Sequence, residues 1–236
     1  MKTSQADNLI QKVSEDYNAI SAEFSNTRSH PWFEFEIYKE LLKKGDRVLD
    51  LGCGNGRLYK YIKEREVDYT GVDVSEALLK HARKLNKGAR FKVGGFLDLP
   101  YSRAWFDKIF CVASFHHVPS KEYRLKALKN MKQILKKDGR LIISVWNLWQ
   151  KKYRKYIYES LLRLHKYDFG DCFIPWGDSG VKRYYHAFSI FEMRSLLNEA
   201  GFNLVEEFYV DNKRICDNFW HSNNMIFIAK PRIYEN

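Results

Sequence analysis

The chain has 236 residues, which is enough for one α/β domain with an insertion and too few for two domains of ordinary size. Hydrophobic residues make up 45% and aromatic residues 16%, a composition that excludes general disorder. Forty Lys and Arg against 29 Asp and Glu give a net charge of +11. This charge favours a polyanionic partner, with nucleic acid ahead of an anionic membrane. The alternative is that the charge only keeps the protein soluble.

Scattered cysteines and a polar N-terminus bear on the cellular setting. Cys53, Cys111, Cys172 and Cys216 form no CxxC pair, so we expect neither a metal site nor a disulfide framework. Residues 1–11 contain no hydrophobic signal core, and no apolar run reaches membrane-spanning length. The sequence therefore predicts a cytoplasmic protein without a membrane partner.

Two helices are predicted ahead of the first strand. Apolar residues recur at helical steps from about residue 8 to residue 24. Pro31 is suited to open a second helix, which Gly45 ends. We expect residues 1–44 to form a helical cap on a single domain that spans residues 1–236.

The sequence VLDLGCGNGR, residues 48–57, organises the rest of the chain. A strand predicted at residues 47–51 carries Asp50 and runs into alternating glycines, which let the backbone pass close to a ligand before a helix over residues 57–66. The spacing departs from the dinucleotide-binding fingerprint. Asp50 would repel a pyrophosphate but attract the cationic methionine part of S-adenosylmethionine. The run resembles motif I of the class I S-adenosylmethionine-dependent methyltransferases.

The next two strands are predicted to supply the rest of the cofactor site. The strand over residues 69–72 ends at Asp73, 21 residues after Gly52, where a carboxylate can accept hydrogen bonds from two ribose hydroxyls. A helix-capping role for Asp73 is the alternative, but Ser75 is the better cap for the helix over residues 76–87. After the strand over residues 90–93, Gly95 stands where related methyltransferases carry an acid that binds adenine. We therefore expect Phe96 and Leu97 to grip the adenine, with Asp98 as a less well aligned substitute.

The fourth and fifth strands are predicted at residues 108–112 and 141–145, on either side of a helix over residues 121–137. Ligands bind at the carboxyl ends of parallel strands, so Ala113, the pair His116 and His117, and Trp146 should face the transferred methyl group. A histidine pair whose hydrogen bonds are satisfied within a loop is the alternative interpretation.

Residues 147–188 interrupt the alternation of strands and helices and are predicted to form a substrate-recognition insert. We expect residues 171–176 and 183–186 to form a loop that returns to the crevice. A helix over residues 189–201 and strands over residues 202–210 and 224–229 then complete a mostly parallel, seven-stranded Rossmann-like sheet with helices on both faces. In the insert, basic residues that could bind phosphates alternate with tyrosines on which bases could stack. An exposed amphipathic helix would explain much of the same pattern. The residues are Lys151, Lys152, Arg154, Lys155, Arg163 and Lys166 with Tyr153, Tyr156, Tyr158 and Tyr167.

More specific sequence words point to one subfamily. YNAI (17–20), FSNTR (24–28), PW (31–32) and RYYH (183–186) resemble the tRNA wobble-uridine carboxymethyl methyltransferases. The resemblance implies that the chain esterifies the carboxylate of 5-carboxymethyluridine in tRNA. It also raises the prospect of a small zinc-binding activator subunit, with which the eukaryotic enzyme works. A small-molecule methyltransferase acting on an organic acid or a quinone precursor is the alternative, and a non-enzymatic RNA-binding module is a second one.

The resemblance assigns residues to three roles. Arg28, His116 and His186 are expected to orient the acceptor carboxylate or its neighbouring phosphate. The residues expected to line the substrate pocket are Trp32, His117, Trp146, Arg183 and Tyr185. The residues expected to bind the cofactor are Asp50, Gly52, Cys53, Gly54, Asn55, Gly56, Asp73, Val74, Phe96, Leu97 and Ala113.

Overall fold

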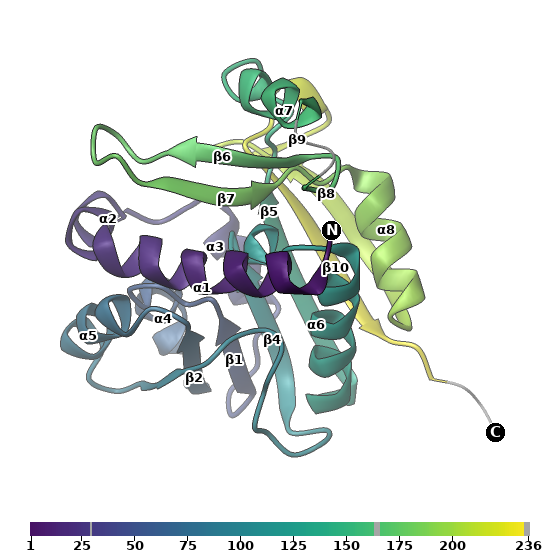
Figure 1. The fold of residues 1–236 in the computed structure, drawn as a ribbon. Helices are drawn as coiled ribbons and strands as arrows, with labels where there is room; N and C mark the ends of the chain where they lie inside the picture. The colour runs from purple at the N-terminus through teal and green to yellow at the C-terminus, as the bar shows by residue number, and fades with distance from the viewer. Residues whose placement is uncertain (29, 163–165, 234–236) are drawn as a thin grey trace.

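An eight-stranded sheet runs through the centre of the protein in the computed structural model, which describes residues 1–28, 30–162 and 166–233. The strand order is β3-β2-β1-β4-β5-β10-β8-β9 (Figure 1). The first five strands in this order are parallel to one another, and β10, β8 and β9 are antiparallel to the strands they pair with. The predicted Rossmann-like α/β fold is confirmed. The sheet has eight strands rather than seven because the short β9 pairs with the end of β8. The strands are β1 (Arg47–Leu51), β2 (Asp68–Asp73), β3 (Arg90–Val93), β4 (Phe106–Val112), β5 (Leu135–Trp146), β8 (Phe202–Val210), β9 (Ile215–Cys216) and β10 (Asn224–Pro231).

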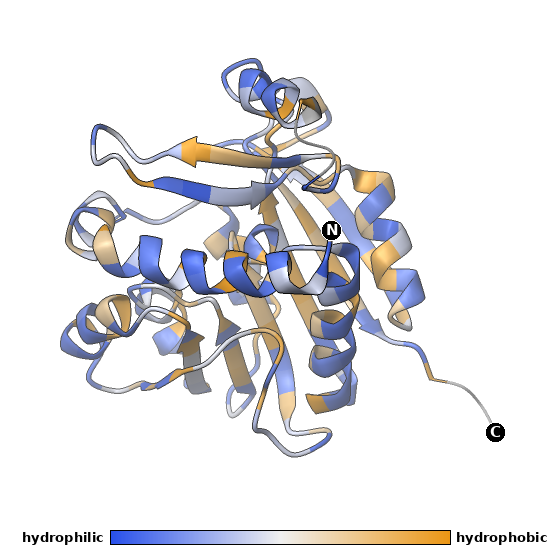
Figure 2. Ribbon diagram, in the orientation of Figure 1, coloured by the Kyte–Doolittle hydropathy of each residue, from blue (hydrophilic) through white to orange (hydrophobic). Residues whose placement is uncertain are grey.

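Helices cover both faces of the sheet because the central strands are apolar on both sides. Along β4, Ile109 and Cys111 pack into one core cluster and Phe110 into the other. Figure 2 shows these apolar central strands behind helices that carry polar residues. On the first face lie α6 (Lys121–Ile134) and α8 (Ile190–Glu199), and on the second lie α3 (Glu34–Glu40), α4 (Arg57–Ile62) and α5 (Glu76–Leu85). The sheet changes winding direction between β1 and β4, which creates a crevice at the carboxyl ends of these strands.

Residues 1–44, the predicted N-terminal cap, begin with α1 (Thr3–Ala19) and α2 (Ser21–Thr27), where the sequence predicted one helix over residues 8–24. The helix breaks because Ile20 leaves helical geometry, with φ −97° and ψ 7°, while its side chain is buried. The following helix begins at Glu34 rather than at Pro31. Three short 3-10 helices of the described chain lie in connections: η1 (Lys63–Arg65), η2 (Phe115–His117) and η3 (Phe219–His221).

The expectation of a loop over residues 171–186 was wrong. β6 (Asp171–Pro175) and β7 (Lys182–His186) form a separate antiparallel hairpin between α7 (Arg154–Leu161) and α1 (Figure 1). Cys172 and Ile174 pack in one cluster with a residue of α7, whereas Tyr184 packs against α1. Pro175 suggested a loop, but it is the last residue of its strand, where a missing N–H is tolerated.

Two further expectations concern the basic insert and membrane-spanning helices. Arg163 of the basic insert lies outside them. Within the described part of the chain, no helix combines the length and the apolar character needed to cross a bilayer.

Candidate functional site

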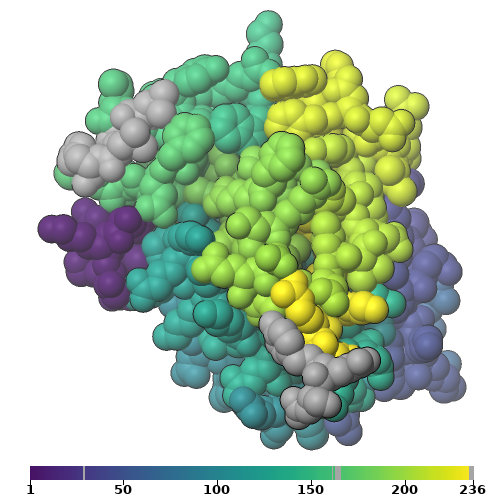
Figure 3. All heavy atoms as spheres, turned by 90° about the vertical axis from the view of Figure 1, so that its right-hand side faces the viewer, coloured from purple at the N-terminus to yellow at the C-terminus, as the bar shows by residue number. Residues whose placement is uncertain are grey.

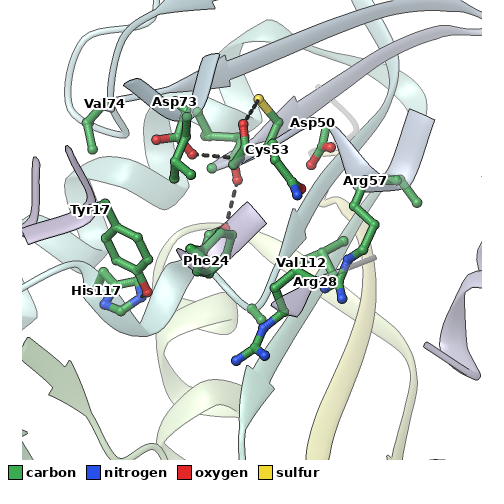
Figure 4. Close-up of a pocket in the computed structure, with 18 of the residues that line it drawn as sticks. Tyr17, Phe24, Arg28, Asp50, Cys53, Arg57, Asp73, Val74, Val112 and His117 are labelled. Carbon is green, nitrogen blue, oxygen red and sulfur yellow. Dashed lines mark hydrogen bonds between the residues drawn. The ribbon is translucent and has the colours of Figure 1, made fainter. Parts of the chain in front are cut away.

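A pocket opens at the carboxyl ends of β1, β2 and β4, and α1 and α2 close one side of it (Figure 4). Figure 4 shows Asp50 and Asp73 along its upper side and Tyr17, His117 and Arg28 along its lower side. Nine of the 11 residues predicted to bind the cofactor line the pocket; the other two are Gly56 and Leu97. Gly56 sits behind the pocket, where its carbonyl accepts from the Asn86 amide, and Leu97 packs against the core.

The glycine turn after β1 brings backbone to the bottom of the pocket. Gly52, Gly54 and Gly56 all adopt left-handed backbone, with φ of +79°, +56° and +73°. The N–H groups of Gly52 and Cys53 both donate to the Val72 carbonyl, at 2.7 Å and 3.0 Å. The turn is therefore fixed against β2 and leaves no room for a side chain at its first glycine.

Replacing Gly52 by alanine is expected to lower the free energy of unfolding by about 2–4 kcal/mol. A Cβ at this position would lie 2.3 Å from the Ser114 Cβ, in addition to the strain of a positive φ. Gly45→Ala is the matched control, because Gly45 has φ +81° but nothing within 4 Å of an added Cβ. Urea denaturation of both variants separates the steric effect from backbone strain, and equal losses would contradict the packing argument.

Asp50 is a buried carboxylate with one free oxygen. Its Oδ2 accepts a hydrogen bond from the Tyr69 hydroxyl at 2.6 Å, whereas its Oδ1 has no partner among the described residues. Burial raises the pKa of Asp50 to about 7, and the nearby charge of Asp73 acts in the same direction. Since a buried carboxylate oxygen needs a partner, Asp50 could hold a cation bound in the pocket.

Asp73 is held in place by the backbone. Its two oxygens accept hydrogen bonds from the N–H groups of Gly54, at 2.8 Å, and Ser75, at 2.9 Å. Burial raises the pKa of Asp73, while these hydrogen bonds oppose the rise. Each oxygen keeps a lone pair, so the carboxylate could still accept from ligand hydroxyls. Ser75 caps α5 as predicted, with its hydroxyl accepting from the Leu78 N–H at 3.1 Å.

The end of the pocket near β3 is built from backbone and apolar groups. Gly94, Gly95, Phe96 and Val74 line it. The carbonyls of residues 96 and 97 accept from the Asn130 amide, at 3.3 Å and 3.0 Å, which fixes this loop. The exposed Asp98 does not line the pocket. A planar ring would therefore be held here by shape and by main-chain groups.

Three arginines lie around the opposite end of the pocket. Arg28 and Arg183 both lie over the Trp176 ring, with 5.4 Å and 4.5 Å between guanidinium carbon and ring centroid, and Arg57 lies 3.9 Å from the centroid of the Trp32 ring. Burial lowers the pKa of Arg57 to about 10, and the charge of Arg28 adds to this effect. Within the described ranges, none of the three makes an ion pair with a carboxylate. This end of the pocket is therefore suited to an anion.

His117 lines the pocket in its neutral form. Its Nδ1 lies 2.7 Å from the Tyr184 carbonyl and must carry the proton, so its Nε2 accepts from the Tyr17 hydroxyl at 2.8 Å. Burial lowers the pKa of His117 to about 3. Tyr17 also accepts a hydrogen bond from Arg183 at 3.4 Å, so α1, β7 and η2 are joined at this point.

The structure does not place two of the predicted orienting residues in the pocket. His116 is fully buried, and its Nδ1 accepts from the Trp146 N–H at 3.3 Å. His186 faces inward from β7, with its ring nitrogens 2.7 Å from Asp171 Oδ1 and 2.8 Å from Glu192 Oε1. Both histidines therefore support the residues around the pocket rather than line it. Arg183 and Tyr185 also stand behind its lining, whereas Arg28, Trp32, His117 and Trp146 belong to it.

Two lining residues were not assigned a role from the sequence. Arg57 directly follows the glycine turn, and Tyr17 lies in the N-terminal cap. Both residues belong to motifs on which the family resemblance rests, and this was the only indication in the sequence that they line the pocket. Their roles depend on contacts between distant segments, since Tyr17 reaches the pocket from α1 and Arg57 stacks on Trp32, which precedes α3.

Comparisons with known proteins identify the family. Residues 49–143 match the model of a methyltransferase domain. A putative methyltransferase of Encephalitozoon cuniculi is 30% identical over 80% of this chain and 86% of its own length. A Saccharomyces cerevisiae protein named tRNA (carboxymethyluridine(34)-5-O)-methyltransferase is 30% identical over 75% of this chain, which spans 60% of the length of that relative.

Solved structures share the fold at lower identity. A S-adenosylmethionine-dependent methyltransferase from Methanosarcina mazei has a TM-score of 0.71 and 20% identity, covering 84% of this chain and 98% of its own. A putative methyltransferase in complex with the Trm112 methyltransferase activator from Haloferax volcanii has a TM-score of 0.66 and 16% identity, covering 92% of this chain and 98% of that one. The chain therefore belongs to the methyltransferase family and has the fold of its S-adenosylmethionine-dependent members.

Proposed function

We propose that this methyltransferase uses S-adenosylmethionine to esterify the carboxylate of 5-carboxymethyluridine at the wobble position of tRNA. The main support is the group of Arg28, Arg57 and Arg183 at the end of the pocket away from Asp73. Among the described residues, none of these arginines pairs with a carboxylate, so they are available to an acidic substrate. The names of relatives such as the Saccharomyces cerevisiae protein support the same substrate.

The cofactor end of the pocket fits S-adenosylmethionine, which supplies the methyl group and the sulfide leaving group. The free Oδ1 of Asp50 binds the α-ammonium group, and Asp73 accepts hydrogen bonds from the ribose hydroxyls. The glycine turn lets backbone approach the ligand, and Val74 and Phe96 enclose the adenine. The other residues proposed for this site are Cys53, Asn55 and Ala113, which line the pocket, and Gly56 and Leu97, which support it.

The acceptor end requires orientation rather than proton removal. A carboxylate with an ordinary pKa of about 4 is already ionised at neutral pH and needs no general base. Arg28 orients it, and Arg183 adds positive charge from behind Tyr17 and Trp176. Trp32 and Trp146 wall the site and exclude water. The neutral His117 fits this scheme, because it holds Tyr17 in place and carries no charge of its own.

A basic and aromatic surface favours tRNA over a small molecule. Lys151, Lys152 and Lys155 are exposed around the start of α7, and the Arg154 guanidinium lies 4.7 Å from the centroid of the exposed Trp220 ring. Figures 1 and 3 show α7 next to the segment that contains η3. Cations that bind phosphates and a ring that stacks on a base suit an anticodon loop. We propose residues 147–188 as the insert that recognises it.

The proposal extends to partners and location. A small activator subunit is a proposed partner, because one structure of this fold is a complex with an activator of that kind. A tRNA substrate makes the cytoplasm the expected location.

Arg28→Ala is expected to lower kcat/KM about 10- to 100-fold on a stem-loop RNA that carries 5-carboxymethyluridine, because one charge-assisted contact is lost. Its affinity for S-adenosylmethionine, measured by calorimetry, should stay within about twofold of the wild type. With S-adenosylmethionine saturating, the rate of the wild type should stay flat above about pH 6, since no base has to titrate.

The control is Arg103→Ala, which removes an exposed arginine outside the pocket. Loss of cofactor affinity in Arg28→Ala would move this residue to the cofactor site. No methylation of the modified RNA by the wild type, together with activity on small organic acids, would overturn the proposed substrate in favour of the small-molecule alternative.

A further inference from the structure

A second pocket adjoins the first, and its asparagine side chains have no role in the proposed function. It shares Arg28, Trp32 and Trp146 with the first pocket and encloses a cavity of about 320 Å³, near the lower end for small-molecule sites. Because of the shared residues, a molecule in the second pocket would lie next to the contents of the first. The remaining lining residues are Pro31, Phe33, Glu34, Gln150, Lys152, Tyr153, Asp211, Asn212, Asn223 and Asn224.

An amide pair in this pocket offers one donor beside one acceptor. The Asn223 Nδ2 donates to the Asn212 Oδ1 at 2.8 Å. This bond leaves the Asn212 Nδ2 as a donor and the Asn223 Oδ1 as an acceptor, neither with a further partner among the described residues. Asn212 is exposed and Asn223 half-buried, so both can meet a ligand that enters from solvent. The pair matches a ring edge on which an N–H stands next to a carbonyl oxygen.

Two carboxylates, Glu34 and Asp211, offset the two cations of the lining, Arg28 and Lys152. Glu34 is buried and accepts a hydrogen bond from the Asn224 amide at 2.7 Å. Asp211 is held by the N–H groups of Lys213 and Arg214, at 2.7 Å and 2.9 Å. The charges of the lining therefore balance, which suits a neutral ring and sugar hydroxyls that donate hydrogen bonds to the acids.

Aromatic side chains provide flat walls for such a ring. The Trp146 and Tyr153 rings are nearly parallel, with an angle of 21° between planes and 6.3 Å between centroids. Trp32 lines the pocket as well. Protein aromatic side chains and amides together are the usual means of holding an unstacked base.

We propose that the second pocket binds the uracil base of the substrate nucleoside, with Asn223 accepting from the base N3–H and Asn212 donating to a flanking carbonyl oxygen. The substituent on C5 then extends toward Arg28, which both pockets share. This inference rests on the proposed function and adds the residues that select the base.

The test uses two stem-loop RNAs, one with 5-carboxymethyluridine and one with its N3-methyl derivative at the wobble position. The wild type is expected to methylate the N3-methyl RNA with a kcat/KM at least about tenfold lower, since the Asn223 oxygen loses its donor. Asn223→Ala is expected to lose about tenfold on the unmodified base and to treat both RNAs alike. Asn223→Asp keeps an oxygen acceptor but loses the donor to Asn212, so it should keep the discrimination while its kcat/KM on both RNAs falls.

Asn8→Ala, on the exposed face of α1, is the matched control and should behave as the wild type. Calorimetry with S-adenosylmethionine reports folding, and all variants should bind it equally. Equal use of both RNAs by the wild type, or discrimination that persists in Asn223→Ala, would overturn this inference and leave the proposed function standing. A wild type that methylates neither RNA would overturn both.

Discussion

The affinity for S-adenosylmethionine is expected to rise about tenfold per pH unit between about pH 5 and 7 and to level off above pH 7. Asp50, with a pKa of about 7, is protonated below that pH in the free protein, and binding a cationic ligand requires its ionised form. Binding therefore releases a proton below pH 7. Calorimetric titrations across this range measure the slope, and a flat profile would contradict the role of Asp50.

Asp50→Asn is expected to weaken cofactor binding while it raises the stability of the unliganded protein. It should weaken cofactor binding about 10- to 100-fold and remove the pH dependence. The folded-state pKa lies above the ordinary value of 3.8, so Asp50 lowers the stability of the unliganded protein as the pH rises from about 4 to 7. The variant should then gain about 1–3 kcal/mol at pH 8. Asp98→Asn, outside the pocket, is the control and also tests whether Asp98 touches the adenine.

Arg124→Met is expected to lower the free energy of unfolding by about 3–5 kcal/mol. The Arg124 guanidinium is buried, donates to the Val118 carbonyl and pairs with Asp171 at 3.2 Å and with Glu192 at 3.6 Å. Removing it leaves the buried Asp171 carboxylate without its cation. Because Asp171 belongs to β6, the hairpin should loosen first, and methyl transfer should fall before the core unfolds.

Lys126→Met is the control for this prediction, since Lys126 is exposed on the same helix. Hydrogen exchange of β6 and β7 measures the local loosening, and urea denaturation measures the global loss. A variant with wild-type exchange in the hairpin would contradict the anchoring role of Arg124.

The sequence was most informative where a residue's role is decided by its nearest neighbours. Asp50, the glycine turn and Asp73 are fixed by the strand ends on which they stand, and the general rule for parallel sheets brings them together. The Ser75 cap is equally local. These elements could be predicted without knowing how distant segments pack.

Other positions depend on contacts between distant segments. His186 looked available to a substrate, but pairing of β7 with β6 turns it toward Asp171 and Glu192. His116 is covered by Tyr185 of the same hairpin, with 4.9 Å between ring centroids. No periodicity in residues 171–186 signalled the hairpin strongly enough, because aromatic and polar residues alternate in it as they do in many loops. The second pocket was equally hidden, since its amides come from separate turns.

The glycine at position 95 has a consequence for cofactor analogues. Val74, Gly95 and Phe96 line the end proposed for adenine, and no acid among the described lining residues stands there to bond the exocyclic N6 amino group. If the adenine is recognised by shape and by main-chain groups, a small alkyl substituent on N6 is tolerated. A carboxylate hydrogen-bonded to the N6 amino group would exclude it. A synthetic cofactor substituted at N6 and bearing a transferable tag could thus serve to label the proposed RNA targets selectively.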